Sequence, residues 1–293
     1  MLAVTGITGH TGKFFLEELK THHYAEPIRC LVHTAGKAAC VTSSGLDTEI
    51  VEGTLDCEAD IRRLLTGADT VVHIANIHYS PEILRIGREC GARRFILVHT
   101  TGMFSKFKSA SAEYREIEDQ IAPMLEECGV TILRPTMIFG DICDYNISKF
   151  IKLVDRLPIL PVVAGGRALI QPVNARDLAK ALYLAMVAPA ASGKAYNISG
   201  ETVLPLRELY RMIADMLGKK RVIISFPMGL CVFGARAIRL ISAGKLDLVE
   251  KVQRMGEDRS FSHEAASADF GYSPEPFETG LRREIEQYIG ANR

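Results

Sequence analysis

The stretch that decides the fold is Leu2-Ala-Val-Thr-Gly-Ile-Thr-Gly-His-Thr-Gly-Lys13, close to the start of a 293-residue chain. Its first four residues are largely apolar, which predicts a short strand covered on both faces. A helix is expected from about His10 to His22, because apolar residues recur there at helical spacing: Phe15, Leu16 and Leu19. The sequence therefore predicts a strand, a glycine turn and a helix in that order.

Three glycines, Gly6, Gly9 and Gly12, stand three residues apart in this turn. They suit a tight turn, a close backbone approach and close helix-to-strand packing, each of which favours a residue without a Cβ atom. The helix that starts there offers free N–H groups and the positive end of its dipole, which suit a pyrophosphate. We therefore interpret the turn as a dinucleotide site rather than a purely structural turn. The expected contacts are Gly6, Thr8, Gly9, His10, Thr11 and Gly12.

The length predicts one large domain with a smaller annex. A net charge of zero gives no electrostatic reason to expect nucleic acid or an anionic membrane as a partner. The 7 cysteines are scattered without CxxC spacing, which indicates reduced thiols, and no His, Cys, Asp and Glu cluster has metal-ligand spacing. Because a strand is expected from residue 2, no leader peptide is expected, and the predicted location is cytoplasmic.

The longest apolar stretch, Phe226 to Ile241, is interrupted by Arg236 and Arg239. It is too short and too charged to be a transmembrane segment. We expect a helix there that packs on the core or faces a partner.

Strands and helices alternate through the first half of the chain, which predicts right-handed crossovers and a parallel sheet with helices on both faces. The fold class expected is α/β, a doubly wound parallel sheet with a smaller C-terminal α+β annex. Residues 1–135 are expected to bind the dinucleotide and residues 136–293 the substrate, with segments near 168–198 returning to the main sheet. The expected strands are 2–5, 28–33, 49–52, 70–75, 95–100 and 130–133, and a longer helix is expected over about 112–128.

In such a sheet the ligand lies beyond the carboxyl ends of the strands. The second strand is followed by His33 and then Lys37 rather than by a carboxylate. This pattern favours NADP(H), with NAD as the alternative, because a carboxylate there would bind the ribose 2′-hydroxyl and reject a 2′-phosphate. Further cofactor contacts are expected after the other strands, at Thr54, Leu55, Ala75, Asn76, Thr100, Pro135 and Thr136.

An ordered set of motifs runs along the chain. It comprises Thr5–Gly12, Gly53–Asp56, Val71–Ala75, Thr100–Thr101, Tyr114, Leu133–Gly140, Gln171–Asp177, Tyr196–Ile198 and Phe270–Pro274. This set resembles the short-chain dehydrogenase/reductase superfamily, in its extended or atypical branch of nucleotide-sugar epimerases, dehydratases and related reductases. The resemblance covers essentially the whole chain and implies a Rossmann fold. It is specific for fold and cofactor class and much less so for substrate.

The resemblance implies hydride transfer between a nicotinamide and a carbon that bears oxygen. Tyr114 would move the proton, and a hydroxyl of Thr100 or Thr101 would hold the oxygen. The family places a lysine four residues after the tyrosine to lower the pKa of the phenol, but this chain has Glu118 there. A carboxylate raises the pKa of a neighbouring phenol, so Glu118 is expected to contact a ribose hydroxyl instead of activating Tyr114 as a base.

Two functions stay open on these grounds. The first is an NAD(P)-dependent oxidoreductase or a nucleotide-sugar epimerase or dehydratase, in which Tyr114 acts as an acid or Thr101 shares the task with a substrate group. The second is a cofactor-binding sensor or scaffold without turnover, similar to the nucleotide-binding accessory subunit of respiratory complex I.

The expected partner is a small molecule, with a nucleotide sugar as one candidate, and a homodimer is one option. Substrate contacts are expected at Asp144, Asn146 and Lys149. Arg167 and Arg176 are candidates for meeting a phosphate.

Overall fold

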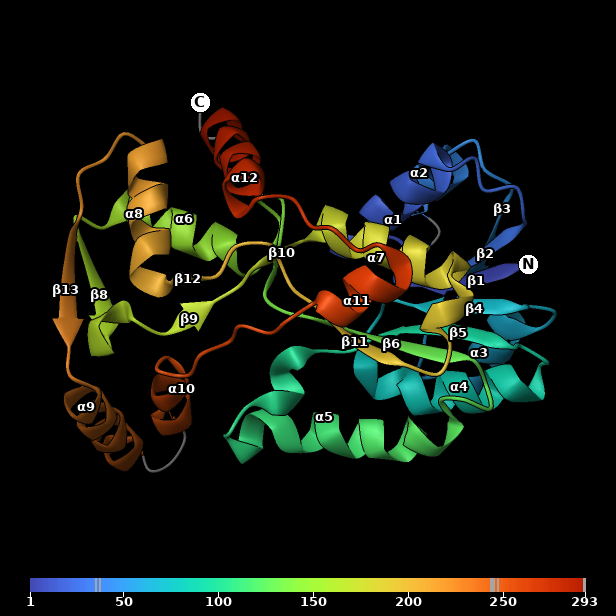
Figure 1. Cartoon of the computed structure of the whole chain (residues 1–293), viewed down its shortest axis with the longest axis horizontal. Coiled ribbons are helices and arrows are strands. Elements are labelled where there is room, and N and C mark those ends of the chain that lie inside the picture. Colours follow the sequence, from blue (N-terminus) through green and yellow to red (C-terminus); the bar gives the residue numbers. More distant parts are fainter. Residues whose placement is uncertain (35, 37, 243–245, 247, 292–293) are drawn as a thin grey trace.

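A computed structural model describes residues 1–34, 36, 38–242, 246 and 248–291. Within them, seven parallel strands form a central sheet on one side of the molecule (Figure 1). In spatial order these strands are β3 (Thr48–Glu52), β2 (Ile28–Val32), β1 (Leu2–Thr5), β4 (Thr70–His73), β5 (Arg94–Val98), β6 (Val130–Pro135) and β11 (Ala195–Ile198). The strand order changes direction at β1, so the helices that connect the strands on its two sides lie on opposite faces of the sheet.

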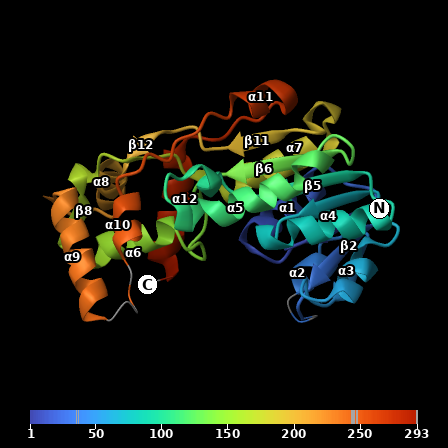
Figure 2. The ribbon, with the colours of Figure 1, turned by 90° about the horizontal axis from the view of Figure 1, so that it is seen from below.

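Helices cover both faces of this sheet (Figure 2). One face carries α1 (His10–Thr21), α2 (Ala39–Thr42), α7 (Ala175–Val187) and α11 (Glu264–Phe270), and the other carries α3 (Glu58–Leu65), α4 (Ser80–Glu89) and α5 (Lys108–Ile121). Along β1 the side chains of Leu2 and Val4 point into the core on the face covered by α1 and α7, and that of Ala3 points into the core on the opposite face. The structure therefore confirms the predicted α/β class and its doubly wound parallel sheet.

Several predicted boundaries are wrong for local reasons. The helix expected over 112–128 is α5, which begins at residue 108 and ends at Ile121, because Pro123 follows and the chain continues as a short 3-10 turn, η4 (Ala122–Met124). The strands expected over 70–75 and 95–100 end earlier, at His73 and Val98. Their last predicted residues belong instead to the loops at the carboxyl edge of the sheet.

Most of the chain after β6 forms a second region with its own core. Its strands pair as β7 (Ile138–Phe139) with β10 (Val173–Asn174), β8 (Ile159–Val163) with β13 (Val222–Phe226), and β9 (Leu169–Ile170) with β12 (Leu204–Pro205). Its helices are α6 (Ile147–Arg156), α8 (Leu206–Met216), α9 (Met228–Ile241), α10 (Val249–Arg254) and α12 (Phe277–Ala291). The chain returns to the main sheet with α7 and β11, where β11 pairs with β6, and again with α11.

The core of this region is made by the helices α6, α8 and α12 together with the strands β7, β8, β9 and β12. Phe139 packs edge-on against Phe277, and apolar residues of α6, α8 and α12 close over them, among them Ile151, Leu209 and Leu281. In the part of the chain that the structure describes, no helix has the length and hydropathy needed to cross a bilayer.

Candidate functional site

The glycine turn between β1 and α1 is packed as closely as the sequence predicts. Gly6 has a φ of +75°, and a Cβ atom added to it would lie 2.9 Å from the amide nitrogen of Ala75. A Cβ atom on Gly12 would lie 2.1 Å from the carbonyl oxygen of Gly6. Both positions therefore require glycine, and the turn is held directly against the end of β4.

A cavity of about 330 Å³ opens beside this turn. Its lining includes Gly6, Gly9, His10 and Thr11 from the turn, Ala75 after β4, and Ile138, Asp144 and Asn146 from the C-terminal region. The adjoining first turn of α1 has no side-chain cap and no acidic residue. Free amides and the positive end of the helix dipole suit an anion such as a pyrophosphate, so the residues present fit a dinucleotide.

Some expected cofactor residues have other roles. Thr8 is half-buried and Gly12 is buried, and neither lines the cavity. Asn76 caps a 3-10 turn, η2 (Ile77–Tyr79), where its side-chain oxygen accepts a hydrogen bond from the amide of His78 at 3.2 Å. Its side chain therefore serves the loop after β4.

The edge of the sheet beyond β2 and β3 carries the remaining expected contacts. His33 is exposed directly after β2, and Lys37 lies outside the described residues. The amide of Thr54 donates a hydrogen bond to Asp60 at 2.9 Å, and Leu55 packs against the core between the main sheet and the helices α3 and α4. Asp56 is exposed and accepts hydrogen bonds from the Tyr79 hydroxyl and the Thr54 hydroxyl, which hold the pKa of its carboxyl below the usual range. A carboxylate thus follows β3 at this edge.

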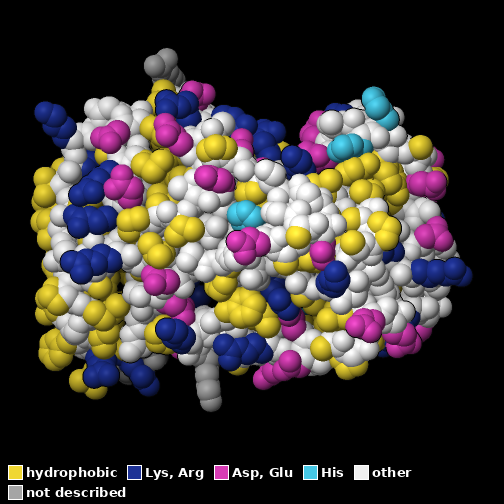
Figure 3. Space-filling view, in the orientation of Figure 1, with side chains coloured by type: hydrophobic (Ala, Val, Ile, Leu, Met, Phe, Trp, Pro, Cys, Tyr) yellow, Lys and Arg dark blue, Asp and Glu magenta, His cyan; other side chains and the backbone are white. Residues whose placement is uncertain are grey.

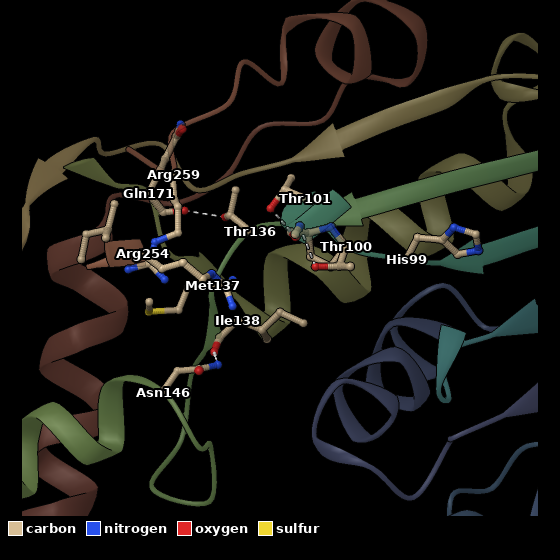
Figure 4. A pocket seen from close by; sticks show the side chains of 13 residues that line it. His99, Thr100, Thr101, Thr136, Met137, Ile138, Asn146, Gln171, Arg254 and Arg259 are labelled. Atoms are coloured by element: carbon tan, nitrogen blue, oxygen red, sulfur yellow. Dashed lines mark hydrogen bonds between the residues drawn. The ribbon is translucent and has the colours of Figure 1, made fainter. Parts of the chain in front are cut away.

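A second cavity, of about 300 Å³, lies between the main sheet and the C-terminal region (Figure 4). It shares Ile138 and Asn146 with the first cavity. The loops after β5 and β6 supply His99, Thr100, Thr101, Gly102, Pro135, Thr136 and Met137, and the C-terminal region supplies Ile170, Gln171, Arg254 and Arg259. The two cavities are therefore neighbours with a common wall.

Two arginines face the threonines across this second cavity (Figure 4). The Nε atoms of Arg254 and Arg259 are buried without a hydrogen-bond partner, and none of the lining residues is acidic. Burial, and then the charge of Arg254, lowers the pKa of Arg259. Nearby Glu257 receives hydrogen bonds from the Ser105 hydroxyl at 2.8 Å and the Lys106 amide at 2.7 Å. Unsatisfied guanidinium donors in a cavity without acids suit an anionic ligand.

The threonine hydroxyls are oriented by the backbone. Thr101 donates to the carbonyl of Pro135 at 3.1 Å, and Thr136 donates to the carbonyl of Gln171 at 2.5 Å. Thr100 instead accepts from the amide of Gly102 at 3.0 Å. The proton of the Thr100 hydroxyl can therefore be donated to a ligand, whereas those of Thr101 and Thr136 are already used.

Tyr114 projects from α5 toward Gly102, in the loop after β5. A Cβ atom built on Gly102 would lie 3.4 Å from its ring, and the ring centroid of His78 is 6.2 Å away. Tyr114 is half-buried and lines neither cavity. It lies behind Gly102, one residue layer from the second cavity.

The expected ribose contact of Glu118 is not supported by its surroundings. Its side chain is 7% exposed, and its oxygens accept hydrogen bonds from Arg134 Nε at 2.9 and 3.0 Å and from His99 Nδ1 at 3.1 Å. Burial raises the pKa of Glu118, but these hydrogen bonds offset it, and the net shift is downward. Because Arg134 neutralises the carboxylate, the negative field expected around Tyr114 is also reduced.

Of the three expected substrate residues, Asn146 reaches both cavities, where its amide donates to the carbonyl of Ile138 at 2.7 Å. Asp144 borders the first cavity but is buried, because it accepts from the amides of Asn146 at 2.6 Å and Ser148 at 3.1 Å at the start of α6. Lys149 lines neither cavity and lies 5.7 Å from the Tyr145 ring.

The two arginines expected to meet a phosphate also lie elsewhere. Arg176 stacks over Phe14 at 4.4 Å, and Arg167 is exposed next to a 3-10 turn, η5 (Ala164–Gly166). The arginines that line the second cavity, Arg254 and Arg259, were not predicted from the sequence. They lie in a segment without a distinctive local pattern, and only the folded chain brings them opposite Thr100.

Solved structures with this fold include nucleotide-sugar enzymes. A dTDP-glucose 4,6-dehydratase from Streptomyces venezuelae superposes with a TM-score of 0.75 at 19% identity, over 99% of this chain and 97% of that one. A UDP-glucose 4-epimerase from Thermotoga maritima gives a TM-score of 0.73 at 17% identity, over 100% and 99% of the two chains. At these identities the likeness concerns the fold.

No protein-family model matches the chain. It is 24% identical over 229 residues to NADH dehydrogenase [ubiquinone] 1 alpha subcomplex subunit 9, mitochondrial, of Dictyostelium discoideum, covering 72% of the chain and 62% of the relative. The same subunit in Arabidopsis thaliana matches at 27% identity over 55% of the chain and 41% of the relative. The chain thus spans less than two thirds of both subunits.

A third relative is a (4-alkanoyl-5-oxo-2,5-dihydrofuran-3-yl)methyl phosphate reductase of Streptomyces griseus. It is 25% identical, over 75% of the chain and 74% of the relative. The sheet order, the glycine turn and these similarities agree with the motifs of the sequence. The chain has a Rossmann fold and is similar in sequence to proteins of the extended short-chain dehydrogenase/reductase superfamily.

Proposed function

We propose that this protein is an NAD(P)-dependent oxidoreductase that acts on a small anionic substrate. The observation that carries the proposal is the pair of adjoining cavities, one beside the glycine turn and one lined by Arg254 and Arg259, with Ile138 and Asn146 common to both. A dinucleotide along the first cavity and an anionic compound in the second would meet near the loops after β5 and β6. Such an arrangement suits transfer between two bound molecules.

In this arrangement each part of the chain would bind one of the two molecules. Residues 1–135 would hold the dinucleotide, and residues 136–293 would hold the substrate, with β11 the part of that region built into the main sheet. NADP(H) is the preferred cofactor in the proposal, because exposed His33 follows β2 where a carboxylate would reject a 2′-phosphate. Asp56 after β3 is the feature that argues for NAD.

A bound nicotinamide would supply or accept the hydride, and the chain's own residues would bind and orient the substrate. Thr100 can donate its hydroxyl proton to a substrate oxygen, and the guanidinium groups of Arg254 and Arg259 can hold a phosphate or carboxylate. Tyr114 is the proposed acid that would provide the proton at the substrate oxygen, although in this structure Gly102 separates it from the second cavity. A phenol is protonated near neutral pH, which suits this direction of transfer.

The names of similar proteins agree with an anionic substrate. The Streptomyces griseus relative is a reductase of a phosphate ester, and the Thermotoga maritima epimerase was solved with UDP-glucose. Both compounds carry phosphate, so the feature that they share is a phosphorylated group. A nucleotide sugar is one member of this class.

The test is a turnover screen with matched substrates. Carbonyl and nucleotide-sugar compounds would be compared with their dephosphorylated counterparts, with nicotinamide absorbance as the readout. We expect turnover of phosphorylated compounds only, and a rise in KM of about tenfold or more for Arg254→Gln or Arg259→Gln, because each removes a charge-assisted hydrogen bond. Arg167→Gln, at an exposed arginine outside both cavities, is the matched control. Equal turnover of the dephosphorylated compounds would contradict the anionic-substrate proposal.

A non-catalytic NADP(H)-binding sensor or scaffold is the second candidate. Its specific support is Glu118, which stands in place of the family lysine. The Glu118 carboxylate accepts hydrogen bonds from Arg134 and His99. Similarity to the mitochondrial NADH dehydrogenase subunits agrees with this reading. Tight cofactor binding without turnover across the screen would favour the scaffold, whereas turnover that is lost in Tyr114→Phe, with cofactor affinity kept, would favour the enzyme.

A further inference from the structure

Helix α9 presents apolar side chains to solvent. Leu230, Phe233, Leu240 and Ile241 are 58%, 71%, 83% and 86% exposed, whereas Ala235 is buried. At 100° per residue the four exposed side chains fall on one side of the helix and Ala235 on the other. The helix expected to pack or face a partner therefore turns its bulkiest residues away from the protein.

The neighbouring pair β8 and β13 continues this apolar surface. Ile159, Val222, Ile224 and Phe226 are all exposed, and β13 leads directly into α9. Both elements lie at the end of the molecule farthest from the main sheet (Figure 1). We define the exposed residues of α9 and of this strand pair as the apolar end face.

The charge along this segment has one sign. From residue 219 to 246 the sequence contains no Asp or Glu and has six cations: Lys219, Lys220, Arg221, Arg236, Arg239 and Lys245. Figure 3 shows apolar and basic side chains together along this end of the molecule. A surface hollow of about 450 Å³ lies beside β13, lined by Arg211, Lys219, Lys220 and Arg221 as well as by one acid, Asp215. Arg211 pairs with Glu208 and Lys219 pairs with Asp155, whereas no acid pairs with Lys220 or Arg221 among the described residues.

We propose that the apolar end face docks on the surface of a lipid bilayer that contains anionic lipids. A helix with a Leu and Phe stripe and flanking arginines lies in the interface plane, with its apolar side among the acyl chains and its cations at the headgroups. The basic hollow beside β13 would meet lipid phosphates. The protein would thus bind peripherally, which needs no membrane-spanning helix.

A second copy of the chain fits this face less well. A two-fold interface places the same patch on both sides, so Lys220 and Arg236 of one copy would face a patch that carries the same cations. Like charges at close range oppose such an interface, whereas an anionic lipid surface compensates them. Charge complementarity therefore selects the bilayer.

The test uses the full chain in a vesicle sedimentation assay. Vesicles of phosphatidylcholine alone are compared with vesicles containing phosphatidylglycerol, at low and high salt. We expect binding to the anionic vesicles, weaker binding at high salt, and little binding to the neutral ones. Phe233→Ser/Leu240→Ser should weaken binding about tenfold or more by removing apolar area, and Lys220→Gln/Arg236→Gln about thirtyfold by removing two cations.

The matched control is Lys180→Gln/Val187→Ser, which changes one exposed cation and one exposed apolar residue on α7. Its binding should equal that of the parent, and circular dichroism should show all variants folded. Absence of parental binding to anionic vesicles would overturn the proposal, as would equal binding by the parent and the apolar variant. A dimer that the same apolar variant abolishes, without vesicle binding, would assign the face to self-association instead.

Discussion

Glu118 is a buried charge whose partners come from two different strand ends. His99 follows β5 and Arg134 lies in β6, and both donate hydrogen bonds to the carboxylate. The other ring nitrogen of His99 lies 3.1 Å from the Ser80 hydroxyl at the start of α4. The glutamate thus ties α5 to the sheet, a structural role that a lysine at this position cannot fill beside Arg134.

Restoring the family lysine with Glu118→Lys should therefore destabilise the protein. It would place a second cation next to Arg134 and leave that guanidinium unpaired, which costs about 3–5 kcal/mol in free energy of unfolding. Urea unfolding followed by circular dichroism measures this loss. Glu116→Lys, at an exposed position of the same helix, is the control and should change stability little. Equal free energies of unfolding for the two variants would show that the hydrogen bonds of Glu118 do not stabilise the protein.

Substitution of Gly9 should affect cofactor binding rather than folding. Gly9 is exposed at the wall of the first cavity, and an added Cβ atom would lie 3.1 Å from the Gly6 carbonyl oxygen. Gly9→Val should abolish NADP(H) binding while the chain stays folded, because the branched side chain fills the space for the pyrophosphate. Calorimetric titration with parallel circular dichroism checks this, with Gly290→Val as a control in open space. Unchanged affinity would show that the pyrophosphate lies elsewhere.

At the scale of elements, amphipathic segments were predictable and their ends less so. The core side chains of α1 and the strands of the main sheet follow from apolar spacing that the fold preserves. The end of α5 depends on Pro123, whereas the apolar spacing alone continues past it to Cys128. The apolar content of α9 predicted its helix, but it gave no information about which side faces solvent.

Helix α12 carries a buried carboxyl group that should make stability depend on pH. Glu284 is fully buried, accepts from the amide of Gly140 at 3.2 Å and lies near Asp144. Burial, and then the Asp144 charge, raises the pKa of Glu284 from 4.5 to about 9. The folded state therefore keeps a proton that the unfolded state releases above pH 4.5, so stability falls as pH rises through this window, by up to about 1.4 kcal/mol per pH unit.

Glu284→Gln should remove this dependence, because an amide mimics the protonated acid. The variant should match the parent near pH 5 and be more stable than it at pH 8. Urea unfolding at both pH values measures the difference, and Glu286→Gln on the exposed side of α12 is the control. A parent that gains stability between pH 5 and 8 relative to Glu284→Gln would contradict the raised pKa.

At the scale of the whole molecule, the sequence predicted one half of the candidate site better than the other. The glycine turn is local, so its fit to a pyrophosphate could be derived from twelve consecutive residues. The second cavity joins Thr100 after β5 to Gln171, Arg254 and Arg259, which are far apart in the chain. Their meeting depends on how the C-terminal region packs on the main sheet, and that packing has no short-range signature. The homodimer stays a prediction.

The preference between NADP(H) and NAD(H) depends on the residues that follow two strands, β2 and β3. His33 after β2 favours a 2′-phosphate, whereas Asp56 after β3 carries a charge that opposes one. We expect tighter binding of NADP(H) than of NAD(H). Asp56→Asn should widen the difference, because it removes the opposing charge and leaves the fold of the loop.

Calorimetric titration of the purified protein with NADPH and with NADH tests whether the cavity beside the glycine turn binds a nicotinamide dinucleotide. We expect saturable binding of one dinucleotide per chain, tighter for NADPH, that is lost in Gly9→Val. Failure of the folded parent to bind either dinucleotide would contradict the account, and tighter binding of NADH would contradict the assigned preference alone.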